Sequence, residues 1–161
     1  MLRSLLLCAL LLPLMGCGDD SSGQQGSPDS GDPTKVTYAE SLNVDLSVMT
    51  RLPSGLFLLD QGAVGTGDEA TNGARVQVHY TGYLPDGKMF ETSEGKAPIA
   101  FNLGLGQVID GWDQGLLGMR VGGKRRLIIP SALGYGAQGS ASGRIPPHSV
   151  LIFDVGLISV R

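Results

Sequence analysis

The sequence predicts an α+β fold in which an antiparallel sheet packs against one short helix. Several short segments show the alternation or the apolar runs of strands, whereas one well-marked segment has helical spacing. Strands and helices do not alternate in the rhythm of a parallel α/β fold. The 25 glycines and 9 prolines among 161 residues indicate many turns, and a hydrophobic content of 42% supports a packed core.

The expected strands begin near residue 56. The segment 75–82 alternates, with Val76, Val78 and Tyr80 on one face and polar side chains on the other. Shorter strands are expected at 55–62, 99–104 and 124–130. In the last segment, 149–160, a second apolar row lies on one face of a strand and consists of Leu151, Phe153, Val155 and Leu157.

One short helix of about two turns is expected within VIDGWDQGLLGM, residues 108–119. Ile109, Trp112 and Leu116 fall on one stripe of this helix and would face the sheet. A second, shorter helix is expected ahead of the domain, because Tyr38, Leu42 and Leu46 also have helical spacing.

The first 16 residues have the features of a lipoprotein signal peptide. Arg3 precedes an apolar run that is short for a membrane span, and the run ends in LMGC, residues 14–17. A small residue directly before a cysteine resembles the bacterial lipobox, in which the cysteine thiol receives a diacylglyceryl group. Cys17 is therefore the expected lipidation site. The alternative is an ordinary secretory signal that is cleaved nearby.

The chain is expected to divide into a signal peptide at 1–16, a lipidated tether at 17–50 and a folded domain at 51–161. Residues 18–35 are rich in Gly, Ser, Asp and Pro, which is typical of a flexible linker with a span of roughly 20–25 Å. Cys8 would leave with the signal and Cys17 would carry lipid, so no disulfide is expected. The expected location is the bacterial cell envelope, on a membrane that the sequence does not specify.

Several functional classes are disfavoured by charge and spacing. A net charge of −3 and a pI near 5.2 argue against a nucleic-acid partner. The G-x-G-x-x-G match at 134–139 is followed by SASGRIPP, which does not open a helix, and 118–125 has Arg125 where a phosphate loop needs Ser or Thr. His79 and His148 lack ligand partners at metal spacing, so no metal or cofactor is expected.

Four motifs together resemble the FKBP-type peptidyl-prolyl cis–trans isomerases. They are VHYTGYLPDGKMFETS at 78–93, PIAFNLGLGQVIDGWDQGLLGMRVGGKRRLIIP at 98–130, GYGAQG at 134–139 and IPPHSVLIFDVGL at 145–157. The resemblance covers roughly residues 56–160. It implies a twisted antiparallel sheet wrapped across a short helix, with a substrate pocket between them.

The resemblance also implies roles for particular residues. Trp112 would form the pocket floor, the Ile109 N–H would bind a substrate carbonyl, and Tyr135 would donate its hydroxyl from a loop above. The implied catalytic residues are Tyr80, Phe90, Glu91, Tyr135 and Phe153. The implied substrate-binding residues are Phe101, Val108, Ile109, Trp112 and Ile145.

The expected function is acceleration of X-Pro bond rotation in exported proteins. The alternative is a non-catalytic chaperone or peptide-binding adaptor on the same fold. The expected partners are proline-containing polypeptides, a membrane reached through the lipid anchor, and rapamycin-type macrolides with weakened affinity. Macrolide binding is in question because Glu91 stands where the family usually has aspartate, and Ile99 stands where an aromatic often lies. A monomer is expected, since no long helical dimerisation segment precedes the domain.

Overall fold

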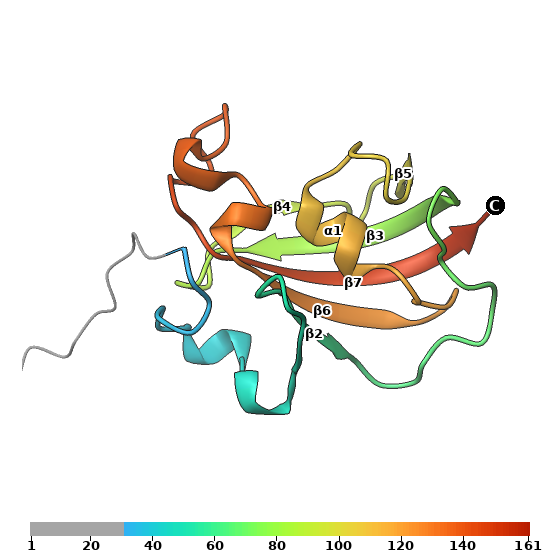
Figure 1. The fold of residues 1–161 in the computed structure, drawn as a ribbon, viewed down its shortest axis with the longest axis horizontal. Helices are drawn as coiled ribbons and strands as arrows, with labels where there is room; N and C mark the ends of the chain where they lie inside the picture. The colour runs from blue at the N-terminus through green and yellow to red at the C-terminus, as the bar shows by residue number, and fades with distance from the viewer. Residues whose placement is uncertain (1–30) are drawn as a thin grey trace, which may run out of the picture.

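The computed structural model describes residues 31–161, so the expected signal peptide, Cys17 and the first part of the tether lie outside the described residues. A seven-stranded antiparallel sheet has the order β1-β2-β6-β7-β3-β4, and β5 also pairs with β3. Its strands are β1 (Thr50–Arg51), β2 (Phe57–Asp60), β3 (Arg75–Tyr83), β4 (Met89–Thr92), β5 (Ile99–Asn102), β6 (Lys124–Ile129) and β7 (Leu151–Val160). The helix α1 (Asp110–Gly115) lies across one face of this sheet (Figure 1).

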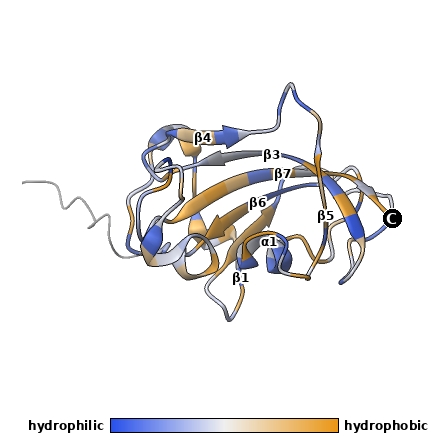
Figure 2. Cartoon of the chain, turned by 90° about the horizontal axis from the view of Figure 1, so that it is seen from above, coloured by the Kyte–Doolittle hydropathy of each residue, from blue (hydrophilic) through white to orange (hydrophobic). Residues whose placement is uncertain are grey.

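The long strand β3 organises the half of the sheet that carries the pocket. Along one edge it pairs with β7 over eight residues of register, and along the other it pairs with β5 and then β4. Val76, Val78 and Tyr80 are buried as the alternation predicts. The expected apolar row of β7 is also buried. Figure 2 shows hydrophobic residues along much of β7 and toward the end of β6, whose first residues are basic. The two-residue β1 is not predicted by the sequence pattern.

Helix α1 lies close to β6 because two of its buried residues are glycines. A Cβ atom on Gly111 would lie 2.5 Å from Ile129 Cγ2, and one on Gly115 would lie 2.7 Å from Leu127 Cδ2. Arg125, which is 8% exposed, holds the end of the helix, since its Nη1 donates to the carbonyls of Gly115 (2.9 Å) and Leu117 (3.0 Å). These contacts fix the height of the helix above the sheet.

The opposite face of the sheet is covered by residues 31–49, which we call the N-terminal strap. Figure 1 shows the strap, in blue to cyan, on the side of the sheet opposite α1. Leu42 and Met49 of the strap are buried in one cluster with residues of β2, β6, β7 and the loop before β7, namely Phe57, Ile128, Val150 and Ile152. Strand β7 is therefore buried on both faces in this region, and its pattern does not alternate there.

The strap is also held by hydrogen bonds along its length. The Ser131 N–H donates to the Gly31 carbonyl (2.9 Å), and the Ala39 N–H donates to the Pro85 carbonyl (2.8 Å). The Arg126 guanidinium donates to the Leu42 carbonyl and forms a two-pronged ion pair with Asp154. The described part of the expected tether is thus packed onto the domain.

The helical spacing of Tyr38, Leu42 and Leu46 does not produce one helix. The strap contains two 3-10 turns, η1 (Glu40–Leu42) and η2 (Leu46–Val48). Asn43 separates them in the left-handed conformation, with φ 47° and ψ 49°, which ends the first turn. Two further 3-10 turns, η3 (Ser131–Leu133) and η4 (Gly136–Gln138), lie in the connection between β6 and β7.

Candidate active site

A cavity of about 410 Å³ opens between α1 and the inner face of the sheet. Its walls come from β3, β4, β5, β7, the segment before α1 and the connection between β6 and β7. The lining residues are Tyr80, Glu91, Ile99, Gly106, Gln107, Val108, Ile109, Trp112, Tyr135 and Phe153. The cavity is thus mostly apolar and aromatic, with a few polar groups at its edge, as small-ligand sites usually are.

The floor of the cavity is a set of aromatic rings that meet edge to face. The Trp112 ring lies 5.0 Å from Tyr80 at 80° and 5.2 Å from Phe153 at 86°, measured between ring centroids and planes. Such contacts match the positive edge of one ring to the negative face of the next and add to the stability that burial provides. Because each ring fixes its neighbours, the floor is rigid.

A second aromatic layer lies behind the floor. The Phe90 ring contacts Phe153 at 5.5 Å and 89°, and the Phe101 ring contacts Trp112 at 5.8 Å. Gly82 makes room for this layer, since a Cβ there would lie 2.5 Å from the Phe90 ring and 2.8 Å from Phe153. The absence of a side chain at this position allows two phenyl rings to pack against the β3 backbone.

Two polar groups of the backbone define one edge of the cavity. Ile109 precedes the first residue of α1, and its carbonyl accepts a hydrogen bond from the Trp112 N–H (2.9 Å). Within residues 31–161 the Ile109 N–H itself has no acceptor, so it is free to bind a ligand. Asp113 holds the preceding loop in place, because its carboxylate accepts from the N–H groups of Gly104 and Gly106, both at 2.8 Å.

Two phenols line the cavity, those of Tyr80 and Tyr135, and the Glu91 carboxylate influences both. Burial raises the pKa of the Tyr80 phenol to about 12, and the charge of Glu91 contributes to that increase. Burial also raises the pKa of the Tyr135 phenol, again with a contribution from Glu91. Both phenols therefore keep their protons at neutral pH and can donate hydrogen bonds. Tyr135 is 38% exposed, so its hydroxyl can reach a ligand in the cavity.

Seven of the ten site residues expected from the sequence line the cavity. They are Tyr80, Glu91, Val108, Ile109, Trp112, Tyr135 and Phe153. Phe90, Phe101 and Ile145 do not line it. The first two form the second layer, and Ile145, which is 4% exposed, is part of the core cluster that surrounds Trp112. The structure thus places these three residues beside the lining residues, and their expected roles toward a substrate stay predictions.

Sequence reasoning missed Gly106 and Gln107 at the cavity edge. Gln107 lies in an irregular loop, and its Oε1 accepts a hydrogen bond from the Asn102 N–H (2.8 Å). Loop positions have no periodicity that would indicate the direction of a side chain. The only available signal was that Gln107 directly precedes Val108 and Ile109.

One of the motifs judged weak in the sequence, the segment 134–139, contributes Tyr135 to the cavity. The segment 134–139 contains the turn η4, and no α-helix follows it within the described chain. His79 lies on the outer face of β3, where its Nδ1 is 3.1 Å from Ser93 Oγ. Among residues 31–161, no three His, Cys, Asp or Glu side chains are grouped in a way that could hold a metal ion.

The model of the family described as FKBP-type peptidyl-prolyl cis-trans isomerase matches residues 67–158. The FK506-binding protein of Neisseria meningitidis serogroup A is 50% identical over 107 residues, which are 66% of this chain and 97% of that protein. The chain belongs to the FKBP family. It is accordingly a peptidyl-prolyl cis–trans isomerase, as the sequence predicts.

Solved FKBP structures agree with the fold. The peptidyl-prolyl cis-trans isomerase of Pseudomonas syringae pv. tomato has a TM-score of 0.62 at 39% identity, covering 70% of this chain and 80% of that one. FkpA of Escherichia coli has a TM-score of 0.64 at 37% identity, covering 76% of this chain and 55% of that one. The α+β prediction of a twisted antiparallel sheet across one short helix is thereby confirmed.

Proposed function

We propose that this FKBP accelerates rotation about X-Pro bonds of exported polypeptides by enclosing the bond in the cavity above Trp112. The observation that carries this proposal is the cavity itself. Its lining combines aromatic rings with Tyr135 and with Ile109, whose N–H has no acceptor within residues 31–161. A prolyl ring can pack against an aromatic floor of this kind. The neighbouring carbonyls of the substrate then lie near the two donors at its edges.

The reaction makes and breaks no covalent bond, so the site needs no nucleophile or metal. The barrier of about 18–20 kcal/mol arises from amide resonance. The planar amide is more charge-separated than the twisted one, and transfer from water to aromatic surroundings therefore raises the free energy of the planar form more. A thousandfold acceleration requires only about 4 kcal/mol of differential stabilisation.

The two donors hold the substrate while the bond turns. The Ile109 N–H is fixed by its position at the start of α1, and the loop before it is braced by Asp113. The Tyr135 hydroxyl approaches from the loop between β6 and β7. Hydrogen bonds from these two donors would orient the carbonyls on either side of the prolyl ring without restraining the X-Pro bond between them.

The test is an isomerisation assay on a proline-containing peptide, with wild type compared to Tyr135→Phe and to the surface variant Glu94→Gln. We expect catalysis by wild type and by Glu94→Gln, and slower catalysis by Tyr135→Phe. A folded wild type that binds the peptide without accelerating its isomerisation would instead support the alternative of a chaperone or adaptor.

The same proposal places the enzyme on the bacterial cell envelope through a diacylglyceryl group on Cys17. LMGC at 14–17 supports it, followed by a polar Gly/Ser/Asp/Pro-rich segment. No helix within residues 31–161 is both long and apolar enough to cross a bilayer. Wild type should incorporate labelled lipid and sediment with membranes, whereas Cys17→Ser should lose the label. Equal labelling of both proteins would remove the lipid anchor but not the isomerase.

Macrolide binding is proposed to be weaker than is usual for the family. Glu91 lines the cavity at the position where an aspartate is usual, and its carboxylate stands one methylene further from the β4 backbone. Ile99 provides less flat surface at the cavity edge than an aromatic side chain would. Both changes affect a rigid macrolide more than a flexible peptide.

A further inference from the structure

Glu91 is the single side chain of an acid or base among the ten that line the cavity, apart from the two protonated phenols. It extends from β4 with its side chain exposed, while its neighbour Phe90 is buried behind Phe153. The other lining residues are apolar, aromatic, glycine or glutamine. A single negative charge therefore lies at the edge of an otherwise uncharged cavity.

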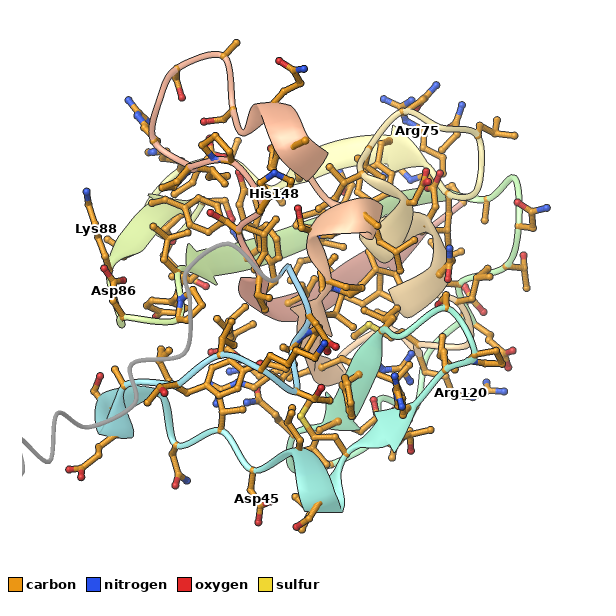
Figure 3. The ribbon with its side chains drawn as sticks, turned by 60° about the vertical axis from the view of Figure 1, so that its left-hand side comes forward. Asp45, Arg75, Asp86, Lys88, Arg120 and His148 are labelled. Atoms are coloured by element: carbon orange, nitrogen blue, oxygen red, sulfur yellow. The ribbon has the colours of Figure 1, made fainter. Side chains whose placement is uncertain are left out.

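No cation within residues 31–161 forms an ion pair with Glu91. The four ion pairs of this part of the chain involve other carboxylates. Of the nearby lysines, Lys88 projects outward from the turn between β3 and β4 (Figure 3), and Lys96 Nζ donates to the Thr92 carbonyl at 3.1 Å. Arg144 is exposed in the loop that precedes β7. The negative charge of the carboxylate is therefore not neutralised by a cation of the described chain.

The charge of Glu91 acts within the cavity as well as at its surface. It contributes to the raised pKa of both the Tyr80 and the Tyr135 phenol, through its charge in each case and through hydrogen bonding to Tyr80 as well. A cationic group held near these two residues would therefore lie in a field of favourable sign. Asp110, exposed directly after Ile109, adds a second negative charge beside the cavity.

We propose that Glu91 makes the enzyme prefer substrates with lysine or arginine immediately before the proline. This inference rests on the proposed function, because the bond that rotates joins the proline to that residue, which must therefore lie beside the cavity. The aliphatic stem of a lysine or arginine can lie along Ile99 while its charged head reaches the carboxylate. A glutamate at the same substrate position would be repelled.

The expected preference is moderate because Glu91 is exposed. Ion pairs in such positions change an equilibrium by about threefold to fivefold. Exposed charges are also screened by salt over about 10 Å at 0.1 M ionic strength, so the preference should decline as salt is added. A preference produced by apolar packing of the lysine stem would not decline in this way.

The experiment compares kcat/KM of the full-length protein on three peptides that differ only before the proline: lysine, acetyl-lysine and glutamate. Acetyl-lysine keeps the lysine stem and removes its charge. We expect wild type to prefer lysine over acetyl-lysine by about threefold to fivefold at low salt, with glutamate least favoured. In Glu91→Gln the ratio between lysine and acetyl-lysine should approach one, whatever the overall rate of that variant.

Glu94→Gln is the matched control, since Glu94 is an exposed glutamate close in sequence that does not line the cavity. It removes the same net charge and should keep the wild-type ratio. A wild-type ratio of one on an active enzyme would overturn the inference while leaving the proposed function intact. An equal decrease of the ratio in both variants would assign the preference to general surface charge and would also overturn it. Absence of catalysis on all three peptides would instead contradict the proposed function.

Discussion

The two faces of the sheet are covered by different segments of the chain. The inner face carries aromatic rings under a six-residue helix, and a cavity of about 410 Å³ remains between them. The outer face carries Phe57, Ile128 and Ile152, and the strap covers them with Leu42 and Met49. Ile128 and Ile152 have no exposed surface. One face is therefore built to receive a ligand and the other to be closed.

The difference shows which face of the sheet gives up stability for the function. Within residues 31–161 the inner face leaves donors without partners, including the Ile109 N–H and the buried Trp112 Nε1. A buried donor without a partner costs about 1–3 kcal/mol. The outer face adds buried aliphatic surface, and each well-buried side chain of that kind contributes about 1.5–3 kcal/mol. The strap thus helps to offset the stability that the open pocket gives up.

The largest effect is expected from Phe153→Ala on the inner face. Its ring contacts Tyr80, Phe90 and Trp112, so truncation removes both packing and cavity floor. We expect a loss of about 3–5 kcal/mol in the free energy of unfolding, together with reduced isomerase activity of the folded fraction. Denaturant unfolding and a peptide assay measure the two quantities. A folded variant with full activity would show that the pocket is assigned wrongly.

Phe90→Ala tests the second layer in the same way. Phe90 does not line the cavity, so its loss should act through displacement of Phe153 and reduce activity less than Phe153→Ala does. The stability cost should again fall near 3–5 kcal/mol. Equal activity losses in the two variants would show that the two rings form one functional layer.

Leu42→Ala makes the corresponding change on the outer face. Leu42 is 6% exposed in the strap, and its removal should cost about 2–5 kcal/mol of unfolding free energy. Activity per folded molecule should be unchanged, because no strap residue lines the cavity. Unaltered stability would mean that the strap contributes nothing to the fold, and altered activity would mean that the two faces are coupled.

Glu91→Asp sharpens the description of the inner face. If the longer side chain misplaces its carboxylate, the shorter one should tighten rapamycin-type macrolide binding by roughly ten- to a hundredfold, the equivalent of about 1.5–3 kcal/mol. The protein has one tryptophan, Trp112, at the cavity floor, so its fluorescence can report the titration. Equal affinity of wild type and variant would show that glutamate serves as well as aspartate.

Tyr135→Phe removes one hydroxyl and leaves the ring. We expect kcat/KM to fall by about tenfold, which corresponds to the loss of roughly 1.4 kcal/mol of hydrogen bonding. Stability should change little, since the hydroxyl has no hydrogen-bond partner within the described chain and the residue is 38% exposed. A loss of stability without a loss of activity would show that the Tyr135 hydroxyl supports the fold and not catalysis.

The smallest expected effect is a pH dependence of stability that comes from one tyrosine on each face. Burial raises the pKa of Tyr80 on the inner face to about 12 and also raises that of Tyr38 in the strap, whose hydroxyl donates to the Pro33 carbonyl at 2.8 Å. Above pH 10 the unfolded chain loses these protons while the folded chain keeps them. The contribution of these two phenols to the free energy of unfolding should therefore be fully present below pH 10 and should decline as the pH rises toward 12.

Denaturant unfolding between pH 9 and 12 measures this decline, and the absorbance of ionised phenols follows the titration. Tyr38→Phe and Tyr80→Phe should each make the decline shallower than in wild type, since phenylalanine does not titrate. A wild-type decline unaffected by either change would show that the two phenols titrate normally in the folded protein.

Much of the inner face could be predicted from sequence. The alternation of Val76, Val78 and Tyr80 set the buried face of β3, and the stripe of Ile109, Trp112 and Leu116 set the face of α1. The resemblance to FKBPs then assigned most of the cavity residues. It did not separate lining residues from supporting ones, because an aromatic residue in a motif has the same pattern whether it faces the cavity, as Phe153 does, or lies behind it, as Phe90 does.

The outer face could not be predicted in the same way. Residues around 31–35 have a linker-like composition, and the spacing of Tyr38, Leu42 and Leu46 suggested one helix. The strap instead forms two 3-10 turns whose course is determined by contacts with β2, β6 and β7. Short segments of this kind have little intrinsic structure in water and take their conformation from the surface that they cover.

The sequence alone determined most strands of the sheet, the helix α1, the family and the residue types around the substrate bond, because periodicity and motif composition are local properties of the chain. The tertiary structure decided which aromatics line the cavity, that the Ile109 N–H stays unpaired, and that residues 31–49 close the outer face. These features depend on contacts between segments far apart in the chain, such as that of Leu42 with β6 and β7. The direction of a side chain relative to a distant element is fixed only when the chain has packed.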